Sequence, residues 1–225
     1  MAAPPALTTS NLTGIYFVNQ YLSDDLTDIL QAQGVGWLAR KAHALASTTL
    51  RIVHHPPRRD GSPPPSPSPP SSLPSSPGSF FGSCYMSPPP SDSYGPAERL
   101  ELHHIHSGAL KDALAIRPLD WSERASVEDA VDAGYVRARA RRADVYDLGS
   151  AFLRMGWTKD VAVHGAIQMV LHGIVQRCGR EWVAEQVLGF EMVKGQRRFV
   201  RRIDFVGPEG DRIRRRVVYD YFDCS

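Results

Sequence analysis

A block of proline and serine in the first half of the chain restricts the fold more than any other feature. Of 18 prolines, 14 lie between Pro56 and Pro96, together with 12 serines between Ser62 and Ser93. Proline lacks the backbone donor that helices and sheets need, and this polar segment has little apolar surface to bury. We therefore interpret residues 56–97 as a disordered, Pro/Ser-rich insertion. A longer loop costs little additional closure entropy, so one domain tolerates it.

The residues outside the insertion suffice for one substantial hydrophobic core. Of the 225 residues, 42% are hydrophobic and 22% are charged, with a formal net charge of +2, which excludes a chain that is disordered throughout. We expect a flexible N-terminus at residues 1–10. A single domain is expected at residues 11–225, interrupted by the insertion.

Several absences in the sequence bear on its cellular setting. No window reaches the roughly 18 consecutive apolar residues of a membrane helix. Residues 1–10 lack the basic and apolar regions of a secretory signal. The cysteines, Cys84, Cys178 and Cys224, are odd in number and far apart, which argues against a disulfide framework. We therefore expect a cytoplasmic protein without stable membrane insertion. The sequence leaves the oligomeric state open.

Short segments of alternating apolar and polar residues fill most of the remaining chain. Two short helices are predicted near residues 22–30 and 37–46, separated by Gly34 and Gly36. Strands are predicted at Leu12–Val18, Thr48–His54, Leu100–His106, Ala109–Ile116, Ala133–Arg141, Ala166–Val175, Trp182–Val193, Arg198–Val206 and Arg212–Phe222. The segment 161–175 fits a helix as well as a strand, because its apolar residues match both periods. This order predicts a mainly β fold, an antiparallel barrel or strongly curved sheet.

The segment between the first two predicted strands resembles a known family. The strand before it carries the glycine–aromatic motif Gly14-Ile15-Tyr16. The segment itself contains Leu22-Ser23-Asp24-Asp25, Leu30, Gly34-Val35-Gly36-Trp37, Arg40-Lys41 and Leu45-Ala46. These residues resemble the helix–turn–helix of the intracellular fatty-acid-binding proteins. The chain is also similar to uncharacterised fungal proteins of lipocalin-like type.

The resemblance implies a calycin β-barrel with a lid of two short helices over one mouth. It also implies intracellular binding of a fatty acid, lipid or lipophilic metabolite, and we expect no cofactor. Members of that family hold the ligand carboxylate with an Arg-x-Tyr pair on the last strand. Here Arg216 and Tyr219 are three residues apart. They point to opposite faces of a regular strand unless a bulge intervenes, whereas Arg215 and Tyr219 share a face.

Arginines and large polar or aromatic residues on the last strands are the candidates for the ligand site. Apolar barrel walls would supply the affinity for a small hydrophobic ligand, and one or two arginines would orient an acidic head group. The predicted ligand-binding residues are Arg202, Arg216, Tyr219, Trp182 and Gln186. A closed barrel of about ten strands leaves an interior that can hold one such ligand.

A catalyst on the same barrel is the alternative function. A cofactor-free isomerase or cyclase acting on a hydrophobic secondary metabolite needs a general acid or base, for which His104, Asp120 and Asp220 are candidates. The sequence contains no nucleophile motif or phosphate-binding loop, which favours a binding protein. The alternative fold is the cone-shaped α+β sheet of nuclear transport factor and scytalone dehydratase relatives, which opens with longer helices.

Two further patterns are interpreted as structural. His103, His104 and His106, joined by His54 or His55, have the residue type of a metal site, but no partner motif accompanies them, so no metal is expected. The segment 194–216 carries nine Lys or Arg against three acids. Arginines that alternate along strands are typical of the solvated face of an antiparallel sheet, so no nucleic-acid partner is expected.

Overall fold

The computed structural model describes residues 1–57, 97–108, 110–126, 135–175 and 178–222. The predicted disorder of the Pro/Ser-rich insertion therefore lies almost wholly outside the described residues, as do Cys84 and Cys224. Cys178 is an exposed free thiol. No helix among these residues is long and apolar enough to cross a membrane.

Ten antiparallel strands, all in one sheet, make up most of the described chain. They are β1 (Gly14–Val18), β2 (Thr48–His55), β3 (Arg99–His106), β4 (Ala113–Pro118), β5 (Arg124–Ala125), β6 (Val136–Ala143), β7 (Ala166–Ile174), β8 (Glu181–Val193), β9 (Gln196–Val206) and β10 (Arg212–Phe222). The order in space is β4-β3-β2-β1-β10-β9-β8-β7-β6-β5, so the first and last strands pair in the middle of the sheet. The ambiguous segment 161–175 contains both a short helix and a strand.

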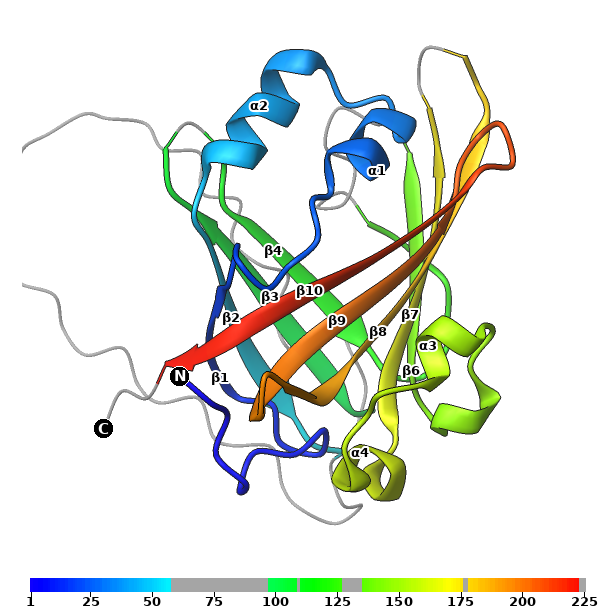
Figure 1. Cartoon of the computed structure of the whole chain (residues 1–225). Helices are drawn as coiled ribbons and strands as arrows, with labels where there is room; N and C mark the ends of the chain where they lie inside the picture. The colour runs from blue at the N-terminus through cyan, green and yellow to red at the C-terminus, as the bar shows by residue number, and fades with distance from the viewer. Residues whose placement is uncertain (58–96, 109, 127–134, 176–177, 223–225) are drawn as a thin grey trace, which may run out of the picture.

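The sheet curls until its two ends meet (Figure 1). The chain leaving β4 returns to β6, where the Trp121 amide donates to the Ala140 carbonyl at 2.9 Å and Asp120 forms a β-bridge with Arg141. In the described part of the chain, strands β4 and β5 each keep a single ladder partner, and these contacts between residues 120–121 and β6 bring the two ends of the curled sheet together around an interior. The predicted mainly β, antiparallel barrel with two short helices is confirmed.

Cross-strand pairing shows which side chains share the inner face, because directly opposite residues in antiparallel strands point the same way. Tyr16 is opposite Tyr221, Tyr219 is opposite Phe199, and Phe199 is opposite Phe190. The Tyr16 and Phe199 rings are 4.7 Å apart, and those of Phe190 and Phe199 are 5.6 Å apart. Each fully buried side chain of this size contributes about 1.5–3 kcal/mol to folding. These rings therefore fill one end of the barrel.

Two short helices, α1 (Thr27–Ala32) and α2 (Trp37–Leu45), lie over one mouth of the barrel (Figure 1). Helix α1 begins later than the sequence suggested, because the residues before it pair with β10. The Asp24 amide donates to the Arg216 carbonyl at 2.8 Å, and the Ser23 hydroxyl donates to the Val218 carbonyl at 3.2 Å. The lid is thus tied to the last strand.

The other mouth is covered by the N-terminal segment, residues 1–13. The Ala3 amide donates to the Arg197 carbonyl at 2.7 Å, and the Arg197 guanidinium donates to the carbonyls of Pro4 and Leu7. Ala3 and Leu7 are buried. Residues 1–10, for which the sequence suggested a flexible terminus, are therefore placed against the barrel in this structure.

Two more helices, α3 (Ala151–Arg154) and α4 (Lys159–His164), lie along the outside of the sheet (Figure 1). Leu153 from α3 and Val161 from α4 are fully buried. They belong to one apolar cluster with Val187, which lies on the outer face of β8. The outer surface of β7–β9 is therefore covered by protein, which explains its buried residues on both faces.

Substituting alanine for Gly173 is expected to destabilise the barrel. The Trp182 ring lies directly over Gly173, and a Cβ at this position would be 2.2 Å from two ring carbons. Trp182 is only 1% exposed and packs on Phe205, so the ring cannot shift without disturbing its neighbours, and overpacking of this kind costs about 1–3 kcal/mol. Urea denaturation measures the loss. Gly36→Ala is the control, since a Cβ there meets nothing within 4 Å; equal stability of the two variants would contradict this packing.

Candidate functional site

The candidate site is on the inner face of the barrel, where an arginine lies among apolar residues. Arg201 on β9 is opposite Leu188 on β8 and Val217 on β10. Leu188 and Val217 are buried members of the main core cluster. Since opposite residues share a face, the Arg201 side chain points into the barrel.

The polar group next to Arg201 is the hydroxyl of Tyr219, which lies two residues beyond Val217 on β10. Tyr219 is 1% exposed, and burial raises the pKa of its hydroxyl, while the charge of Arg201 and a hydrogen bond from it oppose that rise. The Arg201 Nε is buried and has no hydrogen-bond partner. No carboxylate of the described residues forms an ion pair with Arg201, so its Nε is an unused donor on the inner face.

The neighbouring inward arginine, Arg215, differs because the lid occupies it. Arg215 is opposite Ile203, which places it on the same inner face. Its guanidinium forms an ion pair with Asp28 of α1 and donates to the Asp25 carbonyl at 2.9 Å. Arg215 therefore anchors the lid, whereas Arg201 has no such partner.

Three of the five predicted ligand-binding residues lie on the inner face. Tyr219 neighbours Arg201, as described. Gln186 is opposite Ile203 and Trp182 is opposite Gly173, in register with the other inward residues of β8.

The other two predicted residues, Arg202 and Arg216, are opposite one another on the outer face. Both reach Glu191, which is only 3% exposed, and the Arg216 Nη1 lies 3.5 Å from its Oε2. Arg202 also donates to the Phe152 carbonyl and lies over the Trp157 ring, at 5.3 Å from its centroid. These contacts join α3 to the barrel wall rather than line the interior.

Sequence reasoning passed over Arg201 because the segment from Arg197 to Arg202 contains four arginines in two adjacent pairs. Adjacent residues on a strand point to opposite faces, and which of a pair points inward depends on the strand register. The signal available in the sequence was alternation with Phe199 and Ile203, the apolar residues two positions away on each side.

A group of histidines lies at the lid end of the barrel. His104 is opposite Leu50, and His106 is opposite Thr48, whose hydroxyl is 3.1 Å from its Nδ1. The His106 ring is 5.8 Å from that of His43 on α2 and 6.5 Å from that of His104. Among the residues that the structure describes, no three His, Cys, Asp or Glu side chains are placed to hold a metal ion.

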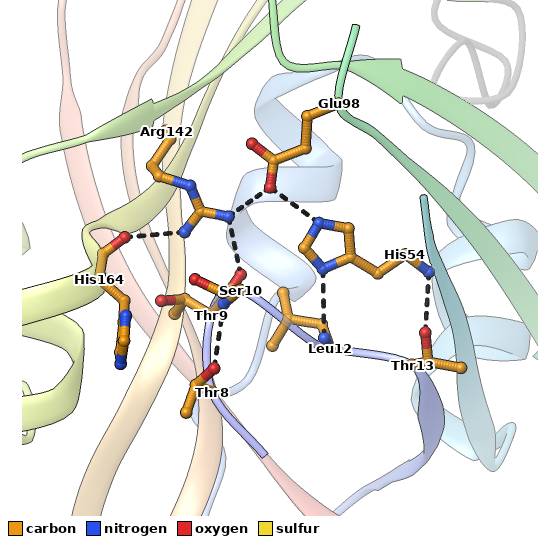
Figure 2. A network of polar contacts seen from close by, with 9 residues as sticks. All are labelled: Thr8, Thr9, Ser10, Leu12, Thr13, His54, Glu98, Arg142 and His164. Atoms are coloured by element: carbon orange, nitrogen blue, oxygen red, sulfur yellow. Dashed lines mark hydrogen bonds and ion pairs between the residues drawn. The ribbon is translucent and has the colours of Figure 1, made fainter. Parts of the chain in front are cut away.

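His54, considered from sequence with these histidines, lies at the opposite end in a polar network (Figure 2). Its Nδ1 accepts from the Leu12 amide at 3.3 Å, and its Nε2 is 2.8 Å from Glu98 Oε1. Glu98 also pairs with Arg142, which donates to the Thr9 carbonyl at 3.1 Å. Burial raises the pKa of Glu98, but hydrogen bonds from His54 and Arg142 outweigh it and hold that pKa below its usual range. The network fastens the N-terminal segment.

The carboxylates proposed for the alternative, catalytic function do not face the interior. Asp120 is bound by Arg124 at 2.7 Å, and this hydrogen bond holds the pKa of Asp120 far below its usual range. Asp220 is opposite Phe17 on the outer face and pairs with Arg198 and the N-terminal amine. Only His104 of the three candidate acids and bases lies on the inner face.

Acidification is expected to weaken the attachment of the lid through His106. Burial lowers the pKa of His106 below its ordinary value of 6.5, while Asp112 opposes that shift. The unfolded chain therefore binds the proton more readily, and stability present above about pH 6.5 is lost as the pH falls through the folded-state pKa. Urea denaturation at pH values on both sides of this range measures the loss. On acidification, His106→Gln should lose less stability than the parent protein. His103→Gln, which changes an outward residue, should lose as much stability as the parent.

The known proteins that are similar to this chain are solved structures. No protein-family model and no curated protein matches the chain. A Schistosoma mansoni fatty-acid-binding protein in complex with arachidonic acid is similar at a TM-score of 0.46 and 9% identity. The match covers 96% of this chain and 100% of that chain. A structure described as the REP1-NXSQ fatty acid transporter has a TM-score of 0.44, 11% identity and coverage of 95% and 98%.

A fatty-acid-binding protein from the brain of Drosophila melanogaster is similar at a TM-score of 0.42 and 9% identity, covering 92% of this chain and 95% of that one. At such low similarity, the function has to be argued from the contacts inside this barrel. The resemblance to fungal lipocalin-like proteins stays a prediction.

Proposed function

We propose that this protein binds a small hydrophobic ligand with an acidic head group, such as a fatty acid, inside the barrel. Arg201 and Tyr219 would hold the carboxylate, and the inner apolar side chains would hold the chain of the ligand. The observation that supports this proposal is the inward guanidinium of Arg201, which no carboxylate of the described residues neutralises.

The energetic reason is the cost of an unneutralised charge that is only partly exposed and lies among apolar side chains. Taking a cation out of water when a ligand covers it costs several kcal/mol, on the order of the penalties known for buried ions, unless an anion and hydrogen bonds compensate for it. A carboxylate can accept two hydrogen bonds from one guanidinium, and the Tyr219 hydroxyl supplies a third donor. An acidic ligand thus completes a site that the chain leaves incomplete.

The inner face around Arg201 supplies the apolar surface that such a ligand needs. Its buried side chains include Leu188, Ile203, Val217, Met169 and Leu171. Burial of apolar surface contributes about 25 cal/mol per Å² and does not depend on direction, so the polar groups determine how the ligand is oriented.

We further propose that the protein acts as a single domain without a cofactor. The odd, scattered cysteines support a cytoplasmic setting. The cofactor-free isomerase or cyclase is not proposed, since two of its three candidate acids and bases, Asp120 and Asp220, are paired on the outside and only His104 is on the inner face. No partner other than the ligand is proposed.

The test is displacement of a fluorescent fatty acid from the purified, delipidated full-length chain. Palmitic acid should displace the probe from one saturable site. Palmityl alcohol, which has the same chain without the charge, should bind about tenfold or more weakly, because it lacks the charge-assisted hydrogen bonds. Equal displacement by both would exclude a carboxylate held by Arg201, and no displacement by either would refute the proposed function.

A further inference from the structure

A second polar group is buried on the same inner wall, at the lid end of β8. The indole Nε1 of Trp182 has no hydrogen-bond partner, although the residue is only 1% exposed. The Trp182 ring packs on Phe205 with centroids 5.6 Å apart and planes inclined by 31°. A buried donor without an acceptor is unfavourable, and native proteins rarely leave one unless water or a ligand completes it.

The position of this indole is fixed by the backbone beneath it. Trp182 on β8 is opposite Gly173 on β7, and its ring lies over that glycine on the inner face. A Cβ at Gly173 would be 2.7 Å from Nε1. Only glycine lets the ring lie flat on β7, and the N–H is therefore held at a defined place on the wall.

The indole and Arg201 are separated along the barrel by a distance that a long acyl chain can span. Leu188, which is opposite Arg201, is six residues beyond Trp182 on β8. At about 3.3 Å per residue this is about 20 Å along the strand. Gln186 lies between them on the same face and is partly exposed. The wall thus carries a polar group at each end of this stretch, with Gln186 between them and the apolar Ala184 and Leu188 on either side of it.

We propose that the ligand is an oxygenated long-chain acid, with a hydroxyl or carbonyl oxygen remote from its carboxylate that accepts a hydrogen bond from Trp182 Nε1. This inference rests on the proposed function, since Arg201 fixes the carboxylate end. A plain hydrocarbon tail would leave the indole donor unpaired, whereas an oxygen at the end of the tail satisfies it. A donor left unpaired is what allows a site to discriminate against ligands that lack the oxygen.

A second tryptophan provides a matched control. Trp157 lies on the outer side of the sheet, and its Nε1 donates to the Leu153 carbonyl at 2.7 Å. It packs against Val193, Val200 and Val218, away from the interior. Phenylalanine at this position removes one indole N–H without touching the inner wall.

The experiment compares the dissociation constants of palmitic acid and ω-hydroxypalmitic acid for the full-length chain, Trp182→Phe and Trp157→Phe. The parent should bind the hydroxy acid about fivefold more tightly, the worth of one hydrogen bond of ordinary strength. Trp182→Phe should lose this preference while it still binds palmitic acid, and Trp157→Phe should keep it. Thermal unfolding of each variant confirms that it is folded.

The outcomes separate this inference from the proposed function. If palmitic acid binds but the parent shows no preference for the hydroxy acid, the oxygenated ligand is refuted and fatty-acid binding stands. The same conclusion follows if Trp182→Phe retains the preference. If neither acid binds the parent, the proposed function fails and the inference fails with it.

Discussion

Arg201→Met should weaken the binding of palmitic acid at least about 30-fold, the effect of losing about 2 kcal/mol or more from one partner of a buried charge pair. Methionine keeps the length and apolar stem of arginine but removes its donors and charge. It also removes an unneutralised cation from the inner face, which offsets the loss of the hydrogen bond to the buried Tyr219 hydroxyl, so the free protein should lose little stability. Loss of affinity with retained stability distinguishes a ligand contact from a structural role.

The control for this variant is Arg214→Met, on the outer face of the adjacent strand. Arg214 is opposite Asp204 and is exposed, with its Nε 3.5 Å from Asp204 Oδ2. It should leave the affinity for palmitic acid unchanged. The affinity for palmityl alcohol should be nearly the same in Arg201→Met and in the parent protein. If both arginine variants weaken the acid equally, the effect is general electrostatics and Arg201 is not the head-group contact.

Glu191→Gln is expected to lower the free energy of unfolding by about 3–5 kcal/mol, the usual cost of breaking a buried ion pair. Glu191 is 3% exposed and is the described carboxylate that pairs with Arg202, itself only 8% exposed. The glutamine side chain is neutral, so the Arg202 charge remains buried without compensation. Because Arg202 also holds the Phe152 carbonyl and contacts the Trp157 ring, α3 should loosen from the barrel.

Chemical denaturation measures this loss, with Glu209→Gln as the matched control. Glu209 pairs with Arg180 at an exposed site, where side chains are 73% and 54% accessible, and surface pairs are worth at most about 1 kcal/mol. The double variant Glu191→Met with Arg202→Met should recover much of the stability, because it removes both charges together. Similar losses in the two glutamine variants would show that the Glu191 pair is not buried in solution.

These two predictions concern neighbouring arginines with opposite roles. Arg201 points inward without a carboxylate, and Arg202 points outward to Glu191. Arg201→Met is expected to change ligand affinity with little effect on stability. Glu191→Gln, which leaves Arg202 without its carboxylate, is expected to lower stability by breaking an ion pair on the outer face. Measuring both quantities for both variants therefore tests the assignment of the two faces of β9.

Much of the fold followed from local patterns in the sequence. Alternating apolar residues predicted the long final strands, since a strand with one buried face needs a period of two. The glycine-flanked helices α1 and α2 were predicted within a few residues of their observed bounds. The start of α1 was displaced because Ser23 and Asp24 bond to β10, a contact between residues far apart in the chain.

The ligand site was less predictable, because it depends on which of two adjacent arginines faces inward. The sequence by itself determined that β9 carries arginines among apolar residues, and that Tyr219 and Trp182 are on strands. Only the tertiary structure decided that Arg201 shares a face with Tyr219, because strand register sets that face and a shift of one residue reverses it. It also decided that α3 covers Arg202, since no local pattern brings residue 152 to the outer wall of the barrel.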